Sequence, residues 1–489
     1  MVAVQVISRT RRRALALPLA VAAISLLCLA AGVAPAAPQS GGTPPRHMIG
    51  CVPRDRDRTE RVNVSTAGDQ ADLPIMRAAV SADGRFVAFS SAAANLVAND
   101  RNGRADVFVR DLRRQTTTRV SVSSTGVEAN GASYYPAISA DGRVIAFRSY
   151  ARNLVSGDGN GVEDVFVHDR ATGRTERVSV ATSGKEADAP SITSSVSADG
   201  TVVAFSTKAS NLDRGDRNGV MDVYVRDRVQ KRTIRATVSL EGETDGASEG
   251  SGISANGGLV VFRSYAANLV VGDTNGLPDV FVRDWRSGTT ERVNVSSLGA
   301  EANAVTFRGS MSGDGRWVAF RSRANNLVAG DSNGALDVFE RDRLTGRTRR
   351  VSVATGGIQA DAAMFPATAR ANAFMSRAFL STGGRFAAFG SRAGNLVDDD
   401  TNAAADVFVH DLHERRTIRV SVGTDGDEAN GDSFVAGVSG DASVIVFTSS
   451  ASNLVPGDTN RLRDAFVRTL GLSGARALCS WPGTSPRLR

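Results

Sequence analysis

The sequence repeats itself seven times, and this repetition constrains the fold more than any other feature. A serine just before an Asp-Gly-Arg-like turn marks each unit. It recurs at Ser81, Ser139, Ser197, Ser254, Ser312, Ser381 and Ser439, in steps of 58, 58, 57, 58, 69 and 58 residues. A fixed period of this length indicates an architecture in which every unit is one supersecondary structure. The single long step carries an 11-residue insertion that includes "ATARANAFMSRAF" (367–379).

Each unit contains four short runs with strand character. In the second unit they are 136–139, 143–149, 164–169 and 177–180, separated by turn sequences such as "ADG" and "RATG". No window has a convincing helical period, so helices should be scarce. Four strands per unit, repeated radially, predict an all-β fold: a seven-bladed β-propeller with four antiparallel strands per blade.

The two ends of the repeat are permuted. The fourth run occurs first at 61–64, before any complete unit, and the last unit ends with its third run at 464–468. A ring explains this arrangement, because the N-terminal strand then completes the last blade and leaves no free sheet edge. The sequence therefore predicts that the propeller spans 61–468.

The repeated units also carry a family resemblance. "SADGRFVAF" (81–89) and "DVFVRD" (106–111) resemble the TolB-like, WD-repeat-like propeller units of exported bacterial proteins. The resemblance covers the seven units and implies the same propeller fold. We expect neither the N-terminal α/β domain of a TolB nor the catalytic domain of a propeller peptidase, because few residues remain on either side of the seven units.

The N-terminus has the pattern of a signal peptide at 1–36. Basic residues at 9–13 precede an apolar stretch at 14–32, and Ala-x-Ala follows at 34–36. A retained membrane anchor is the alternative. We expect an extracellular or cell-envelope protein with a disordered linker at 37–60 and a C-terminal tail at 469–489. Cleavage would lower the formal charge from +7 to +3, because four arginines leave. Such a charge does not favour nucleic-acid binding.

The expected mature chain has two cysteines, Cys51 and Cys479, which flank the predicted closure of the ring. In an exported protein such a pair is a candidate disulfide. Two unrelated free thiols are the alternative.

The loop between the second and third runs carries an Asp-x-Asn-x-x-x-Asp pattern in every unit. The copies are Asp100/Asn102/Asp106, Asp158/Asn160/Asp164, Asp216/Asn218/Asp222, Asp273/Asn275/Asp279, Asp331/Asn333/Asp337, Asp400/Asn402/Asp406 and Asp458/Asn460/Asp464. Carboxylate and amide oxygens are ligands for Ca²⁺, so the 21 residues are candidate metal ligands. The alternative is structural, because Asx side chains build turns by bonding backbone amides. The leucine of the preceding Asn-Leu pair should anchor the loop in the core.

The loop before each unit carries a second acid or amide, as at Glu128, Glu301 and Gln359. In antiparallel blades both loops lie on the same face of the ring. We expect a monomer that binds a protein, peptide or glycan on this long-loop face.

Signals for catalysis are weak. "GASEG" (246–250) lacks the context of a nucleophile elbow, and His168 and His410 look like surface substitutions in the third run. No catalytic residue is assigned. The sequence therefore favours a non-enzymatic binding scaffold, with stabilisation by calcium as an open alternative. The alternatives are a hydrolase or lyase with acidic residues at the channel mouth, and a structural envelope protein.

Overall fold

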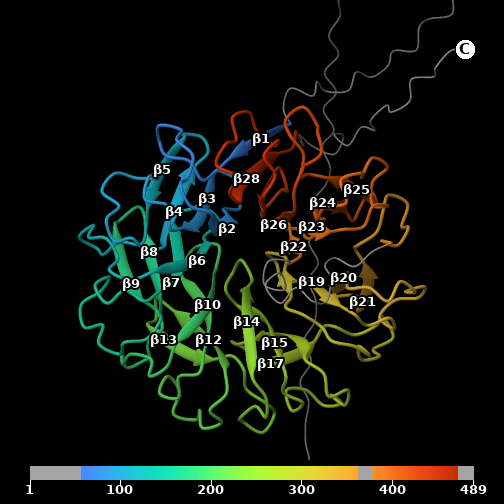
Figure 1. Ribbon diagram of the computed structural model, residues 1–489. Helices are drawn as coiled ribbons and strands as arrows, with labels where there is room; N and C mark the ends of the chain where they lie inside the picture. Colours follow the sequence, from blue (N-terminus) through green and yellow to red (C-terminus); the bar gives the residue numbers. More distant parts are fainter. Residues whose placement is uncertain (1–56, 362–376, 472–489) are drawn as a thin grey trace, which may run out of the picture. The chain divides into compact units, whose positions relative to one another are not determined.

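The computed structural model describes residues 57–361 and 377–471, which form seven four-stranded antiparallel sheets arranged in a ring (Figure 1). The described part of the chain contains strands, turns and bends but no helix. The predicted seven-bladed β-propeller is thus confirmed.

The strands of the first four blades follow one another in the chain. Blade 1 contains β2 (Ile75–Val80), β3 (Phe86–Ser91), β4 (Asp106–Asp111) and β5 (Thr116–Arg119). Blade 2 contains β6 (Ser133–Ile138), β7 (Val144–Ser149), β8 (Asp164–Asp169) and β9 (Arg174–Arg177). Blade 3 contains β10 (Ser191–Val196), β11 (Val202–Thr207), β12 (Asp222–Asp227) and β13 (Arg232–Arg235). Blade 4 contains β14 (Ser248–Ile253), β15 (Leu259–Ser264), β16 (Asp279–Asp284) and β17 (Thr289–Arg292).

The last three blades include the closure of the ring. Blade 5 contains β18 (Ser310–Met311), β19 (Trp317–Ser322), β20 (Asp337–Asp342) and β21 (Arg347–Arg350). Blade 6 contains β22 (Phe379–Leu380), β23 (Phe386–Ser391), β24 (Asp406–Asp411) and β25 (Arg416–Arg419). Blade 7 contains β26 (Ser433–Val438), β27 (Val444–Ser449), β28 (Asp464–Thr469) and, as its fourth strand, β1 (Arg58–Arg61).

The ring closes as the permuted ends predict. Strand β1 pairs antiparallel with β28, with Arg58 opposite Thr469 and Arg61 opposite Phe466. The first strands of neighbouring blades contact one another all the way round, from β2 through β6 to β26 and back to β2. These first strands therefore surround the central axis of the ring.

The core lies between the blades and repeats with them. The second and third strands each contribute one aromatic ring, and these rings stack within a blade, as Phe89 does on Phe108 with centroids 5.6 Å apart. The leucine of the Asn-Leu pair is buried in every blade, which confirms its predicted anchoring role. The rings and leucines explain why one sequence pattern builds seven similar blades.

Two details differ from the sequence-based expectations. The fourth strand was predicted to begin at the Arg of Arg-Val-x-Val, but it ends there, as β5 does at Arg119. The Val-x-Val residues instead cross toward the next blade, where Val122 forms an isolated bridge with Glu128. His168 and His410 are not surface substitutions. Both are buried between blades, where their Nδ1 atoms bond the hydroxyls of Thr175 and Thr417.

The predicted signal peptide, most of the linker, the tail, Cys51, Cys479 and most of the insertion lie outside the described residues. Within 57–361 and 377–471, no helix has the length and hydropathy needed to cross a membrane.

Candidate functional site

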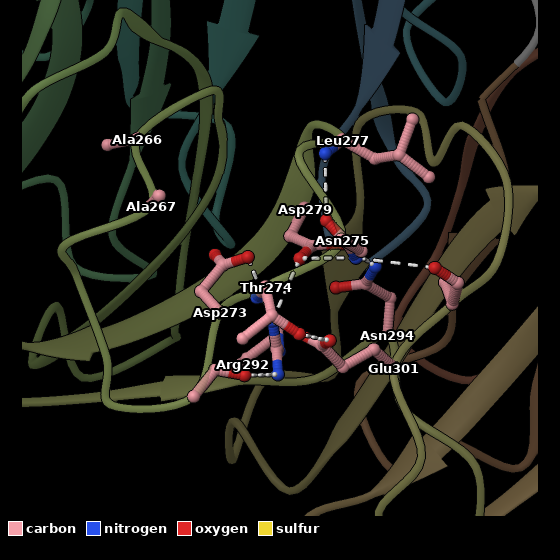
Figure 2. Close-up of polar contacts among 12 residues, drawn as sticks. Ala266, Ala267, Asp273, Thr274, Asn275, Leu277, Asp279, Arg292, Asn294 and Glu301 are labelled. Atoms are coloured by element: carbon pink, nitrogen blue, oxygen red, sulfur yellow. Dashed lines mark hydrogen bonds and ion pairs between the residues drawn. The ribbon is translucent and has the colours of Figure 1, made fainter.

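The asparagine of each Asp-x-Asn loop builds the turn. In blade 4, Asn275 Oδ1 accepts a 2.8 Å hydrogen bond from the backbone amide of Leu277, two residues ahead. Its Nδ2 donates to Asp279 (Figure 2) and also to the carbonyl of Ala302. The asparagine thus ties the loop to the start of the third strand and to the connection that leads to the next blade.

The asparagines of the other six loops make the same contacts. In each of them Oδ1 accepts from the backbone amide two residues ahead, and Nδ2 donates to a backbone carbonyl of the following loop. The six are Asn102, Asn160, Asn218, Asn333, Asn402 and Asn460. The turn-building contacts are thus present in all seven loops. Each amide oxygen has a second lone pair, so the metal-ligand role of the seven asparagines stays a prediction.

The last aspartate of each loop is a buried acceptor at the start of the third strand. Asp164 and Asp337 each accept a 2.5 Å bond from a buried serine of the Arg-Val-x-Val segment, Ser179 and Ser352 respectively. Asn294 takes the same role for Asp279. Burial raises the pKa of Asp279, although Asn294 and the Arg292 charge oppose the rise.

An arginine lies in the centre of each carboxylate set. In blade 4, Arg292 Nη1 lies 3.1 Å from Asp273 and 3.2 Å from Asp279, and it also donates to Glu301 (Figure 2). Arg292 is the last residue of β17, and its side chain is only 9% exposed. The guanidinium therefore offsets part of the negative charge of the two loop aspartates and of the acid of the following loop.

The same arrangement recurs around the ring. Each arginine ends the fourth strand of its blade and pairs with the first aspartate of the loop. These seven arginines are Arg61, Arg119, Arg177, Arg235, Arg292, Arg350 and Arg419. We call these assemblies the loop networks. Sequence analysis missed the arginine, although Arg precedes Val-x-Val in nearly every unit and could have indicated it.

Three of the loop networks raise the pKa of their first aspartate well above its usual range. Burial, with the neighbouring Asp106, raises the pKa of Asp100 to about 6 against the charge of Arg119. Burial likewise raises the pKa of Asp273 and of Asp400 to about 6. Two sets, Asp100/Asp106/Glu128 and Asp273/Asp279/Glu301, bring three carboxylates within 4.8 Å of one another. A metal ion there would have to displace the arginine that already bonds all three.

The repeat is broken at the axis of the ring. The residue four positions before the unit serine differs from blade to blade. The seven residues are Arg77, Tyr135, Thr193, Gly250, Arg308, Arg377 and Val435. The first strands also lose their regular register here, as between Ile75 and Arg77 and between Tyr134 and Ala137. Tyr135 has a φ of 54°, a conformation that costs energy and recurs at functional sites.

The arginines at this position, four residues before the unit serine, approach one another across the axis of the ring. Burial and the charges of Arg77, Arg308 and Arg321 lower the pKa of Arg377 to about 9. The charge of Arg308 also contributes to lowering the pKa of Arg77. Arg308 belongs to blade 5 and Arg77 to blade 1, and these blades are not neighbours in the ring. Side chains from such separated blades interact only where they meet at the centre.

A second layer of arginines lies behind the first on the second strands. Arg148 lies over the ring of Tyr135, 4.1 Å from its centroid, and Arg263 and Arg321 flank Phe307 at 5.7 and 5.2 Å. The equivalent residues of the other blades are Ser90, Ser206, Gly390 and Thr448. The arginines of this layer therefore belong to blades 2, 4 and 5 alone. We call the six arginines and their contacts the axial cluster.

Two glutamates complete the axial cluster. Glu249 bridges Arg263 at 3.1 Å and Arg308 at 2.8 Å. Burial alone would raise the pKa of Glu249, but the two arginines outweigh burial and lower it. Glu163 is 2% exposed and forms an ion pair with Arg148, whose Nε lies 3.0 Å from its Oε1 and whose Nη1 donates a 3.4 Å hydrogen bond to its Oε2. Burial raises the pKa of Glu163.

The axial cluster was not predicted. Its residues are scattered through the sequence, and only an alignment of the units on their serine shows that this column breaks the repeat. The "GASEG" serine, Ser248, lies nearby but is buried and bonds Ser264, as expected for a residue without a nucleophilic role.

No family model matches the sequence, and no curated protein is significantly similar to it. Solved structures with a similar fold include oligogalacturonate lyase in complex with manganese, with a TM-score of 0.49 and 13% identity over 85% of this chain and 96% of that one. TolB from Acinetobacter baumannii has a TM-score of 0.37 and 17% identity over 64% of this chain and 59% of TolB. Pyrococcus horikoshii acylaminoacyl peptidase has a TM-score of 0.45 and 10% identity over 81% of this chain and 51% of the peptidase.

These comparisons confirm the resemblance to TolB-like propellers in fold, and they correct the functional prediction. The main prediction, a non-enzymatic scaffold, is contradicted: the similar structures include a lyase and peptidases. The chain spans less than two thirds of the TolB and of the peptidase. At such identities the likeness shows the fold alone, so any catalytic groups must be sought among this chain's own residues.

Proposed function

We propose that the protein is a hydrolase or lyase whose active site is the axial cluster. The observation that carries this proposal is the break in the repeat: polar side chains that differ between blades converge at one level of the axis. A scaffold repeats its polar groups around the ring, whereas an enzyme needs one asymmetric constellation of acids, bases and charge-stabilising groups. The level lies near the start of the first strands, toward the long-loop face.

The two glutamates of the axial cluster supply a candidate acid–base pair. Glu249 is held ionised between Arg263 and Arg308 and suits a base or nucleophile. Glu163 is buried beside Arg148, and its raised pKa suits a proton donor. Environments that push two carboxyl groups in opposite directions are typical of acid–base catalysis. The arginines would stabilise negative charge that develops on the substrate.

The test is turnover by the purified full-length protein. Polygalacturonate, alginate, xylan and a peptide library are incubated with it, and new reducing ends, unsaturated products and new amines are measured. Glu163→Gln and Glu249→Gln should each lower turnover by about 10²-fold or more. Exposed Glu241→Gln is the matched control and should leave turnover unchanged. Turnover that survives both axial substitutions would contradict the assignment.

We propose that calcium does not occupy the seven loops of the unaltered protein, which the sequence-based prediction treats as candidate sites. In each loop network the arginine holds the place among the carboxylates, so an ion would bind only where the arginine is removed. Export to the envelope or the medium, and the Cys51–Cys479 disulfide, remain proposals. N-terminal sequencing of the secreted protein and thiol titration under denaturing, non-reducing conditions test them.

A further inference from the structure

The axial cluster carries a strong imbalance of charge. Its described ionisable groups are six arginines and two glutamates. They are Arg77, Arg148, Arg263, Arg308, Arg321, Arg377, Glu163 and Glu249. Residues 362–376 contain no Asp or Glu in their sequence. Among residues 57–361 and 377–471, the axis therefore carries an excess of positive charge.

The packing holds this charge in place. The side chain of Arg308 extends from blade 5 and passes directly over Gly250 of blade 4. A Cβ at Gly250 would lie 2.5 Å from Cδ of Arg308, so only glycine leaves room for the arginine there. Its guanidinium then reaches Glu249 of blade 4. Arg77 lies over Tyr135 at 5.0 Å, with Arg148 on the same ring. Several separate contacts thus hold guanidinium groups around one axis.

The crowding has an energetic cost that an anion would relieve. Burial and then Arg263 lower the pKa of Arg321 to about 10, and Arg377 is lowered further. Like charges in a poorly solvated site disfavour one another. A bound carboxylate would offset this repulsion and form forked hydrogen bonds with the guanidinium groups.

We propose that the axial cluster binds the carboxylates of an acidic oligosaccharide, the substrate class of the enzyme proposed above. This inference rests on the proposed function for its site but concerns recognition rather than turnover. Arginines from blades 1, 2, 4, 5 and 6 surround the axis, so a ligand with several spaced carboxylates reaches more of them than a single small anion does. Glu163, Glu249 and the Tyr135 hydroxyl add acceptors for sugar hydroxyl groups, which a site built for phosphate alone does not need.

The experiment is calorimetric titration of the full-length protein at physiological salt with four probes. These are trigalacturonate, tri-mannuronate, neutral maltotriose and inorganic phosphate. We expect both acidic trisaccharides to bind, maltotriose not to bind, and phosphate to bind at least tenfold more weakly. Arg77→Met, Arg308→Met and Arg377→Met should each weaken trigalacturonate binding at least tenfold, and exposed Arg113→Met should not. Melting curves establish that each variant is folded.

The outcomes separate the two proposals. Binding of acidic trisaccharides without turnover of any substrate supports this inference and contradicts the proposed enzyme. Turnover of a neutral glycan or a peptide without binding of either acidic trisaccharide overturns the inference and leaves the enzyme. Phosphate that binds as tightly as the trisaccharides, or binding that the three axial substitutions do not change, also overturns it.

Discussion

The loop networks and the axial cluster both bury arginines, but they use them in opposite ways. Each loop network surrounds one arginine with two or three carboxylates, and the pattern recurs in every blade. The axial cluster sets six arginines against two glutamates and occurs once. The loop networks surround each arginine with opposite charge, whereas the arginines of the axial cluster lie near like charges, which fits the ligand site proposed there. Substitutions in the two regions should therefore have opposite consequences.

The largest expected effect follows from removing an arginine of a loop network. Arg292→Met leaves Asp273, Asp279 and Glu301 without their shared cation. Loss of one partner from a buried ion pair costs about 3–5 kcal/mol. We expect a comparable fall in the free energy of unfolding, measured by denaturant titration at pH 7. Arg286→Met, on an exposed turn of the same blade, is the control.

A loss below about 1 kcal/mol in the Arg292 variant, similar to that of an exposed pair, would mean that the networks do not stabilise the blades.

The second effect is a pH dependence set by the loop networks. The pKa values of Asp100, Asp273 and Asp400 are raised to about 6 by burial, so the folded protein binds more protons than the unfolded chain between about pH 4 and 6. The contribution of these groups to the free energy of unfolding therefore falls as pH rises through this window. We expect a change of about 1–3 kcal/mol after solvent screening, measured by melting at constant ionic strength.

Carboxylates on the opposite face of the ring determine how the stability changes at pH values below this window. Hydrogen bonds from Arg143 lower the pKa of Asp169 to about 2, so its stabilising effect is present above pH 4 and is lost as pH falls toward 2. The melting temperature should therefore be highest between about pH 4 and 5, before the loop aspartates ionise. A melting temperature that rises steadily from pH 5 to 8 would contradict the assignment.

The fold was predictable because the repeat, its turns and its permuted ends all depend on local pattern. The position of the fourth strand was not predictable, because the residues of this outer strand are polar, as "RTER" in β9 shows. The apolar alternation that is typical of a strand lies instead in the segment that follows. His168 looked exposed because its equivalents are arginines. Among those arginines, Arg110 and Arg226 are themselves buried and Arg283 and Arg341 are half-buried, which only the packing of neighbouring sheets determines.

The loop networks and the axial cluster also differ in how much of each could be predicted from the sequence. The aspartates and asparagines of the loop networks stand close together in the sequence, so their turn-building role could be proposed from spacing. The arginine that neutralises them comes from 13 residues after the last aspartate in blade 4, and its contact depends on strand pairing. The axial cluster joins five blades, so no local pattern could show it.

A smaller effect is expected at the axis. Arg377→Met removes a poorly solvated charge whose neighbours are arginines, so the loss of charge relieves repulsion. Replacement of buried charges by apolar groups is often neutral or stabilising. We expect the free energy of unfolding to stay unchanged or to rise by about 1 kcal/mol, measured as for Arg292→Met. A loss of more than about 2 kcal/mol would show that Arg377 is a structural residue like those of the loop networks.

The smallest effect is expected from calcium on the unaltered protein. Because Arg292 already bonds all three carboxylates of its set, Ca²⁺ or a chelator should leave the melting temperature unchanged. In Arg292→Met the same carboxylates lose their cation, and an extracellular-type site with a Kd of about 10⁻⁴–10⁻³ M becomes available. At roughly 10 mM Ca²⁺ this variant should regain about 1.4–2.7 kcal/mol. Arg377→Met leaves the carboxylates of the loop networks paired with their arginines, so this variant is the control.

A clear rise in the melting temperature of the unaltered protein would show instead that calcium displaces the arginines, and the loop networks would then be metal sites.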